Sequence, residues 1–144
     1  SRNSNKKSTL KGWFASLGGQ VVEVRVEGEA RYLLAEHEDE LAATQPSRAT
    51  CLLGAFDQFV LGPGTKDTHM LANEHRSRVS KAAGWIAPVL TQGGRITGVW
   101  EMDDGNLVVT PFPGEQAPSS KALEDAAARL AAVHGLVKVT PRVG

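Results

Sequence analysis

The sequences LLGAFDQFVLG, at residues 52–62, and WIAPVLTQGGRITGVW, at residues 85–100, enclose the polar, basic segment KDTHMLANEHRSRVSK at residues 66–81. The first run is apolar but for one acid, Asp57, and we interpret residues 51–61 as one long strand. Gly54 favours a β-bulge within this strand. The second run consists of two strand-like halves around Gln92-Gly93-Gly94, which is typical of a hairpin turn. Together these stretches predict an antiparallel β domain.

A second hairpin follows in EMDDGNLVVTPF, where residues 103–106 supply the turn. The resulting meander of four or more antiparallel strands must either bury both faces or close. Pro88 indicates an edge or a bulge in its strand, because proline cannot donate a ladder hydrogen bond. We therefore expect a small antiparallel β-barrel or a strongly curled sheet.

The stretch SSKALEDAAARLAAVHG, at residues 119–135, predicts a helix over residues 120–134 that covers this β unit. Ser119 or Ser120 suits its N-cap and Gly135 its C′ position. One side of the helix forms a stripe of Leu123, Ala127, Leu130 and His134. The following LVKVT predicts a final strand.

The N-terminal third combines one helix with one hairpin. After a polar lead-in at residues 1–8, Leu10, Trp13, Phe14 and Leu17 have helical spacing, and Ser8 or Thr9 suits the N-cap. QVVEVRV and ARYLL alternate as two strands about residues 27–29, and an acidic helix or linker ends at Pro46. This pattern fits the end of a winged helix and a plain helix–hairpin unit equally well.

Composition narrows the class of protein. The formal net charge is zero, which argues against an independent nucleic-acid-binding domain, and no apolar run is long enough to span a bilayer. The single Cys51 is interpreted as a buried intracellular thiol, and the four histidines lack metal-site spacing. Charge is nevertheless segregated: residues 23–40 are acidic, whereas residues 41–100 carry a basic excess.

Several phrases resemble the C-terminal signature of the AlkZ-like family, the bacterial crosslink-unhooking DNA glycosylases with winged-helix domains. The matching phrases are Ala55-Phe56-Asp57, Leu61-Gly62, Arg78-Val79, Pro88-Val89-Leu90 and Gly94-Arg95, with Gly98 and Trp100. The resemblance covers roughly residues 10–140 and only the back part of such proteins. It departs from the family pattern at Gly54, Gln58 and Lys66-Asp67. It implies that the family's catalytic Gln-x-Gln or Gln-x-Asp motif lies in a missing front part, since no glutamine here has such a partner.

The resemblance also implies DNA contact through the segment between residues 62 and 84, as the counterpart of a projecting hairpin. We interpret this segment as a mobile loop or long hairpin, with a solvated basic loop as the alternative. Arginine and lysine suit phosphate contacts, and the candidate DNA-binding residues are Lys66, Arg76, Arg78, Lys81 and Arg95. Asp57 is a possible arginine-orienting acid, or else faces outward or fixes an arginine structurally. Phe56, Trp85 and Trp100 could stack on bases, but we interpret both tryptophans as core residues.

These observations predict an α+β chain with a flexible lead-in at residues 1–8, a winged-helix remnant and linker at residues 9–46, and an antiparallel β domain at residues 47–144. The predicted function is the DNA-binding C-terminal portion of a cytoplasmic DNA-repair glycosylase acting on alkylated or crosslinked DNA. We expect no catalytic residue, metal or cofactor in this chain, and double-stranded DNA and the missing winged-helix domains as partners. The alternatives are a non-catalytic winged-helix DNA-binding or transcription-related protein, and a protein-interaction domain.

Overall fold

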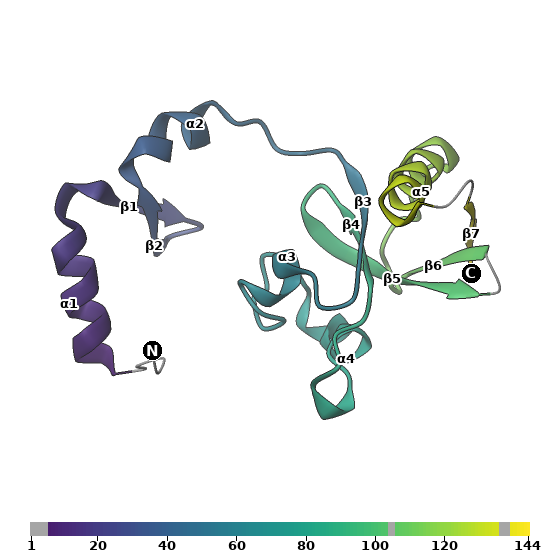
Figure 1. Cartoon of the computed structure of the whole chain (residues 1–144), viewed down its shortest axis with the longest axis horizontal. Helices are drawn as coiled ribbons and strands as arrows, with labels where there is room; N and C mark the ends of the chain where they lie inside the picture. Colours follow the sequence, from purple (N-terminus) through teal and green to yellow (C-terminus); the bar gives the residue numbers. More distant parts are fainter. Residues whose placement is uncertain (1–5, 104–105, 136–138) are drawn as a thin grey trace. The chain divides into compact units, whose positions relative to one another are not determined.

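The computed structural model describes residues 6–103, 106–135 and 139–144 and divides into two compact units, Ser1–Gln45 and Pro46–Gly144 (Figure 1). Unit 1 has the elements α1 (Lys7–Leu17), η1 (Gly18–Gln20), β1 (Val21–Val26), β2 (Glu29–Leu34), η2 (Ala35–His37) and α2 (Glu38–Ala43). No helix in the described residues is long and apolar enough to cross a membrane.

The helix and hairpin of unit 1 confirm the sequence prediction. β1 and β2 are antiparallel, and the turn between them has positive φ at Glu27 (51°) and Gly28 (85°), as a two-residue type I′ turn requires. The predicted Ser8 or Thr9 cap is wrong, because α1 begins at Lys7 without a side-chain cap. A single helix and hairpin occur in many folds, so the winged-helix assignment stays a prediction.

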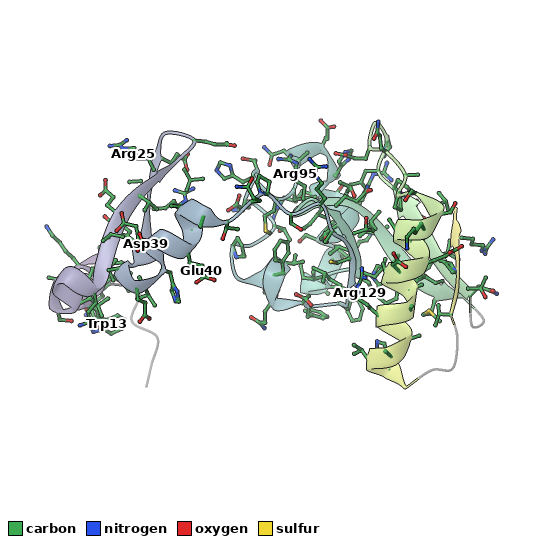
Figure 2. All side chains as sticks on the ribbon, turned by 90° about the horizontal axis from the view of Figure 1, so that it is seen from above. Trp13, Arg25, Asp39, Glu40, Arg95 and Arg129 are labelled. Atoms are coloured by element: carbon green, nitrogen blue, oxygen red, sulfur yellow. The ribbon has the colours of Figure 1, made fainter. Side chains whose placement is uncertain are left out.

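Unit 1 lacks a buried core within its described residues. None of them is buried, although α1 carries Trp13 and Phe14 and the hairpin carries Tyr32 (Figure 2). Phe14 and Tyr32 touch, with ring centroids 5.0 Å apart, but Trp13 and Tyr32 keep more than half of their area exposed. Burial of apolar area is the main source of folding free energy, so unit 1 gains little from its own described residues.

Unit 2 is built on one sheet with the order β3-β4-β5-β6-β7. Its strands are β3 (Thr50–Leu53), β4 (Val89–Gln92), β5 (Arg95–Asp103), β6 (Asn106–Pro111) and β7 (Thr140–Val143). The predicted hairpins pair as expected, and the bulge lies between Leu90 and Thr91, beyond Pro88. The middle of the second hairpin turn, residues 104–105, lies outside the described residues.

The sheet differs from the prediction in closure and in the direction of one strand. β3 and β7 form its two edges in the described structure, so the sheet is open and curled, and the closed barrel is wrong. β7 runs parallel to β6, whereas an antiparallel domain was expected. The cause is α5 (Ser120–His134), because a helix between two strands returns the chain for parallel pairing. The predicted final strand is shifted to residues 140–143, and residues 136–138 lie outside the description.

α5 confirms the predicted helix and its local signals. The Ser119 hydroxyl accepts a hydrogen bond from the Ala122 N–H, and Gly135 has φ of 65° at the C-terminal end. Leu123, Ala127 and Ala131 are buried against the sheet, in one core cluster with Trp100. Trp100 is therefore a core residue, as predicted. Its Nε1 donates to the Leu53 carbonyl oxygen over 2.9 Å.

The predicted long strand at residues 51–61 is wrong. β3 ends at Leu53, and Asp57 becomes the N-cap of a short helix, α3 (Gln58–Leu61). The Asp57 Oδ1 accepts a 2.8 Å hydrogen bond from the Phe59 N–H. This side-chain-to-backbone bond is the reason for the change, because it favours a helix start over a continued strand.

The segment at residues 62–84 folds into short helices, so the predicted long hairpin is wrong, whereas its mobility stays a prediction. It forms η3 (Asn73–His75), α4 (Arg76–Val79) and η4 (Ala82–Gly84). Leu71 and Val79 are almost fully buried in a second core, where they pack with Val60, Ile86, Val89, Ile96 and Phe112. The Ile96 N–H donates to the Met70 carbonyl oxygen over 2.7 Å. We call residues 62–84 the insert.

Substitution of Gly98 tests the close approach of β5 and β6. A Cβ atom added there would lie 2.6 Å from the Thr110 carbonyl oxygen on β6. We expect Gly98→Ala to lower the free energy of unfolding by about 2 kcal/mol, because one strand must shift. Denaturant unfolding of the chain measures this loss. Gly54→Ala is the control, since no atom lies within 4 Å of its added Cβ. Equal unfolding midpoints for the two variants would contradict the close β5–β6 approach.

Candidate nucleic-acid interface

All five predicted DNA-binding residues lie in unit 2. Lys66, Arg76, Arg78 and Lys81 belong to the insert, and Arg95 begins β5 after the Gly93-Gly94 turn (Figure 2). Lys66, Arg78, Lys81 and Arg95 are exposed, and Arg76 is half-buried. Four of the five cations therefore lie in one segment, but their side chains differ in the contacts that they make.

The side chains of Arg76 and Arg95 each donate a hydrogen bond to another part of unit 2. The Arg76 Nε donates to the Thr65 hydroxyl over 3.3 Å, within the insert. An Arg95 Nη donates to the His69 carbonyl oxygen over 3.0 Å, beside the Ile96–Met70 bond. Arg95 therefore fastens the insert to the first residues of β5.

The other three cations, Lys66, Arg78 and Lys81, differ in that their side chains make no such bond in the described structure. Within the described part of the chain, the side chains of Lys66, Arg78 and Lys81 have no hydrogen-bond or ion-pair partner. The insert's acids are engaged: the Asp67 Oδ1 accepts from the His69 N–H, and Glu74 lies 3.6 Å from the His75 ring nitrogen. Arginine and lysine side chains without such partners are available to contact phosphates.

Asp57 does not contact an arginine in the described structure. Its Oδ1 caps α3, and the residue lies on a turn after β3, not inside a strand. The arginine-orienting role stays a prediction. The observed role is to end the strand and start the helix.

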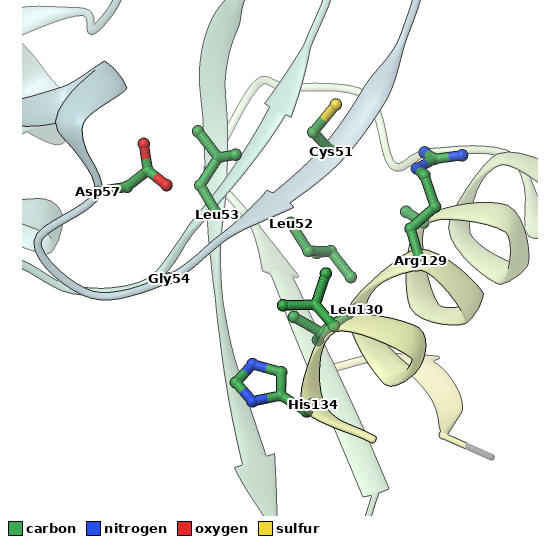
Figure 3. Close-up of a pocket in the computed structure, with 10 residues that line it drawn as sticks. Cys51, Leu52, Leu53, Gly54, Asp57, Arg129, Leu130 and His134 are labelled. Atoms are coloured by element: carbon green, nitrogen blue, oxygen red, sulfur yellow. The ribbon is translucent and has the colours of Figure 1, made fainter. Parts of the chain in front are cut away.

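A hollow of about 360 Å³ lies between β3 and α5, beside Asp57 (Figure 3). Leucine side chains from both elements line it, together with Cys51, Arg129 and His134. An Arg129 Nη donates to the Thr50 carbonyl oxygen over 2.7 Å. Cys51 is only half-buried, so the prediction of a buried thiol is wrong. Sequence reasoning did not select Arg129, because its partner lies 79 residues away and no local pattern marks the contact.

The chemistry available in the hollow is limited. Within the described structure, Cys51, Asp57 and His134 make no hydrogen bond to one another, so no nucleophile is paired with a base. The described residues also contain no cluster of three or more His, Cys, Asp or Glu side chains that could hold a metal. The described lining of the hollow therefore holds no hydrogen-bonded catalytic pair.

Phe56 and Trp85 form an exposed pair at the insert. Their ring centroids are 5.0 Å apart and the ring planes are nearly perpendicular, at 85°. Trp85 is 52% exposed, so the prediction that it is a core residue is wrong. The observed strand begins after Trp85, because β4 starts only at Val89.

The two arginines of the acidic hairpin, Arg25 and Arg31, bond to residues of the same hairpin. An Arg25 Nη donates to the Gly28 carbonyl oxygen over 3.0 Å, and Arg31 pairs with Glu29. Both side chains therefore stabilise their own turn and strand, which suits them as controls for the cations of the insert.

The division of the basic residues has a measurable consequence. Arg95→Met should lower the free energy of unfolding by about 1 kcal/mol, because it removes the bond to the His69 carbonyl. Arg78→Met should change it by less than about 0.5 kcal/mol, as for an exposed side chain without partners. Thermal unfolding followed by circular dichroism compares the two variants. A larger loss for Arg78→Met would show that the roles have been assigned the wrong way round.

Three comparisons with known proteins agree with one another. A family model described as "DNA glycosylase AlkZ-like" matches residues 3–133. The chain is 50% identical over 143 residues to an "Interstrand DNA cross-link repair glycosylase" of Streptomyces sahachiroi; the match covers 99% of this chain and 38% of that relative. A solved structure, "Streptomyces sahachiroi DNA glycosylase AlkZ", superposes with a TM-score of 0.94, and the match covers 100% of this chain and 39% of the solved one. The chain thus spans well under half the length of these relatives.

Proposed function

Since this chain belongs to the AlkZ-like DNA glycosylase family, we propose that it is a DNA-contacting portion of a glycosylase that acts on crosslinked or alkylated DNA. The observation that carries this proposal is 50% identity, across nearly the whole chain, to an interstrand crosslink repair glycosylase. At this identity the resemblance extends beyond the fold, which is also shared at a TM-score of 0.94.

Base excision is assigned to the part of the relatives that this chain does not match. The chain has no Gln-x-Gln or Gln-x-Asp sequence, and its described residues contain no hydrogen-bonded pair of nucleophile and base. Its contribution is to hold the DNA. Positioning a substrate is itself a large part of catalysis, because it removes the entropy cost of alignment from the chemical step.

Unit 1 is proposed to be the end of a winged helix, with the β1–β2 hairpin as the wing. The exposed side chains of α1, among them Trp13 and Phe14, support this assignment, because the other helices of a winged helix would cover such a face. The proposed partner is double-stranded DNA in the bacterial cytoplasm, together with the preceding winged-helix domains.

The proposed phosphate contacts are Lys66, Arg78 and Lys81. Their exposure and lack of partners support this assignment. Arg76 and Arg95 are proposed as secondary contacts, since each side chain already makes an internal hydrogen bond. Contacts to phosphate release counterions, so they produce a measurable salt dependence of binding.

Reversing the charge of two of these residues tests the proposed phosphate contacts. The double variant Arg78→Glu, Lys81→Glu should weaken binding of the chain to duplex DNA, whatever its sequence. It should also flatten the plot of log K against log salt by about one unit for each lost contact. Fluorescence anisotropy at several salt concentrations measures both effects.

The matched control reverses the same number of charges in unit 1, as Arg25→Glu, Arg31→Glu. We expect a much smaller change, because both arginines are engaged in the acidic hairpin. Equal losses from the two double variants would place the DNA contact elsewhere.

A separate experiment tests the proposal that base excision belongs to the part of the relatives that this chain does not match. The purified 144-residue chain should release no base from alkylated or crosslinked DNA, even under conditions in which it binds the duplex. Release of modified bases, followed by chromatography, would refute the division of labour. A preparation that binds DNA serves as its own control for correct folding.

A further inference from the structure

The Phe56–Trp85 pair has no structural role that accounts for its exposure. Phe56 keeps 42% of its area exposed and Trp85 keeps 52%, although each is large and apolar. In an edge-to-face pair, only one face of one ring is covered by the other ring, so flat aromatic surface remains accessible. The two residues come from separate segments, the turn after β3 and the position directly after the insert.

The backbone has an unfavourable conformation at Phe56 and just before Trp85. Phe56 has φ of 59°, and Ala83, two residues before Trp85, has φ of 57°. Residues other than glycine rarely adopt this left-handed region, and such conformations cluster at functional sites. One of the two lies in the aromatic pair itself and the other is two residues away from it.

A tight turn fixes Trp85 in this position. The Lys81 N–H donates to the Trp85 carbonyl oxygen over 2.8 Å, and the Trp85 N–H donates to the Ala82 carbonyl oxygen over 3.3 Å. A bridge between Ser80 and Ile86 continues this pairing toward α4. Trp85 is therefore presented by a closed, hydrogen-bonded turn, which lowers the entropy cost of binding through its ring.

Two of the cations whose side chains lack partners lie within seven residues of Trp85 in the sequence. Lys81 closes the turn that carries Trp85, and Arg78 lies on α4 (Arg76–Val79), directly before it. Flat aromatic surface beside cations is the combination that binds single-stranded nucleic acid, through base stacking and phosphate contact. A protein partner would not by itself require the cations.

We propose that Phe56 and Trp85 form a stacking surface for an unpaired base of DNA, while Arg78 and Lys81 hold the adjacent phosphates. The inference rests on the proposed function, since it names the form of DNA that this surface binds. Bases within a duplex have both faces covered by their neighbours, so only a base outside the stack can lie against an aromatic side chain.

The test uses the 144-residue chain and two duplexes of the same sequence. One is fully paired, and the other carries a single bulged 2-aminopurine, whose fluorescence falls when it stacks. We expect the chain to quench the bulged base and to bind the bulged duplex about tenfold more tightly than the paired one. Trp85→Ala should remove the quenching and the preference, and Trp85→Tyr should retain part of both.

Phe59→Ala is the matched control. Phe59 is as exposed as Phe56, at 42%, and lies three residues along the chain, but its ring has no aromatic partner among the described residues. This variant should keep the preference for the bulged duplex, whereas Phe56→Ala should reduce it. An equal effect of the two substitutions would overturn the inference.

The remaining outcomes separate the inference from the proposed function. Failure of the unaltered chain to bind either duplex would overturn both. Equal binding of the two duplexes, or a preference that survives Trp85→Ala, would overturn the stacking surface and leave the proposed function intact. We expect the thermal midpoint of Trp85→Tyr to equal that of the unaltered chain. A marked fall would indicate that the pair packs against protein, and would also overturn the inference.

Discussion

The hydrogen bond from the Trp100 indole to the Leu53 carbonyl oxygen is the constraint on which much of unit 2 depends. The ring is buried on β5 in the core beneath α5, and Nε1 reaches the last residue of β3. A buried indole N–H without an acceptor would cost free energy, so the bond fastens the last residue of β3 to the Trp100 side chain on β5. The chain leaves the sheet there and enters the turn that carries Phe56 and Asp57.

The insert extends this arrangement through a second core. Leu71 and Val79 bury the inner side of the insert, so its outer side is held in place. Arg95 and the Ile96–Met70 bond tie it to β5. The segment with the exposed cations, which leads directly to Trp85, is therefore packed against the core of unit 2. Such packing favours a binding surface, because less conformational entropy is lost when a ligand binds.

Local signals in the sequence predicted the elements that depend on local chemistry. Ser119, Gly135 and the spacing of Leu123 and Ala127 specified α5, and the glycine turns specified the hairpins. The end of β3 was missed, since the apolar run continues past Leu53 and the Asp57 cap leaves no mark in hydrophobicity.

Long-range contacts account for the other errors. Leu71 and Val79 lack a regular spacing, so the second core of the insert was not visible in the sequence. The candidate cations were selected by charge alone, and their contact with DNA stays a prediction. Their division could not be predicted, because Arg95 bonds to a carbonyl 26 residues away. The parallel pairing of β7 likewise depends on where α5 returns the chain.

The absence of a buried core in the described part of unit 1 has a consequence for the dynamics of the chain. Amides deep in β5 and β6 can exchange with solvent only when the sheet opens, whereas those of the β1–β2 hairpin are protected by little more than their own ladder. Hydrogen exchange is then expected to be faster in the hairpin than in the central strands of unit 2. A surface that covers α1 would slow hydrogen exchange throughout the hairpin, because binding to the folded form is what stabilises it.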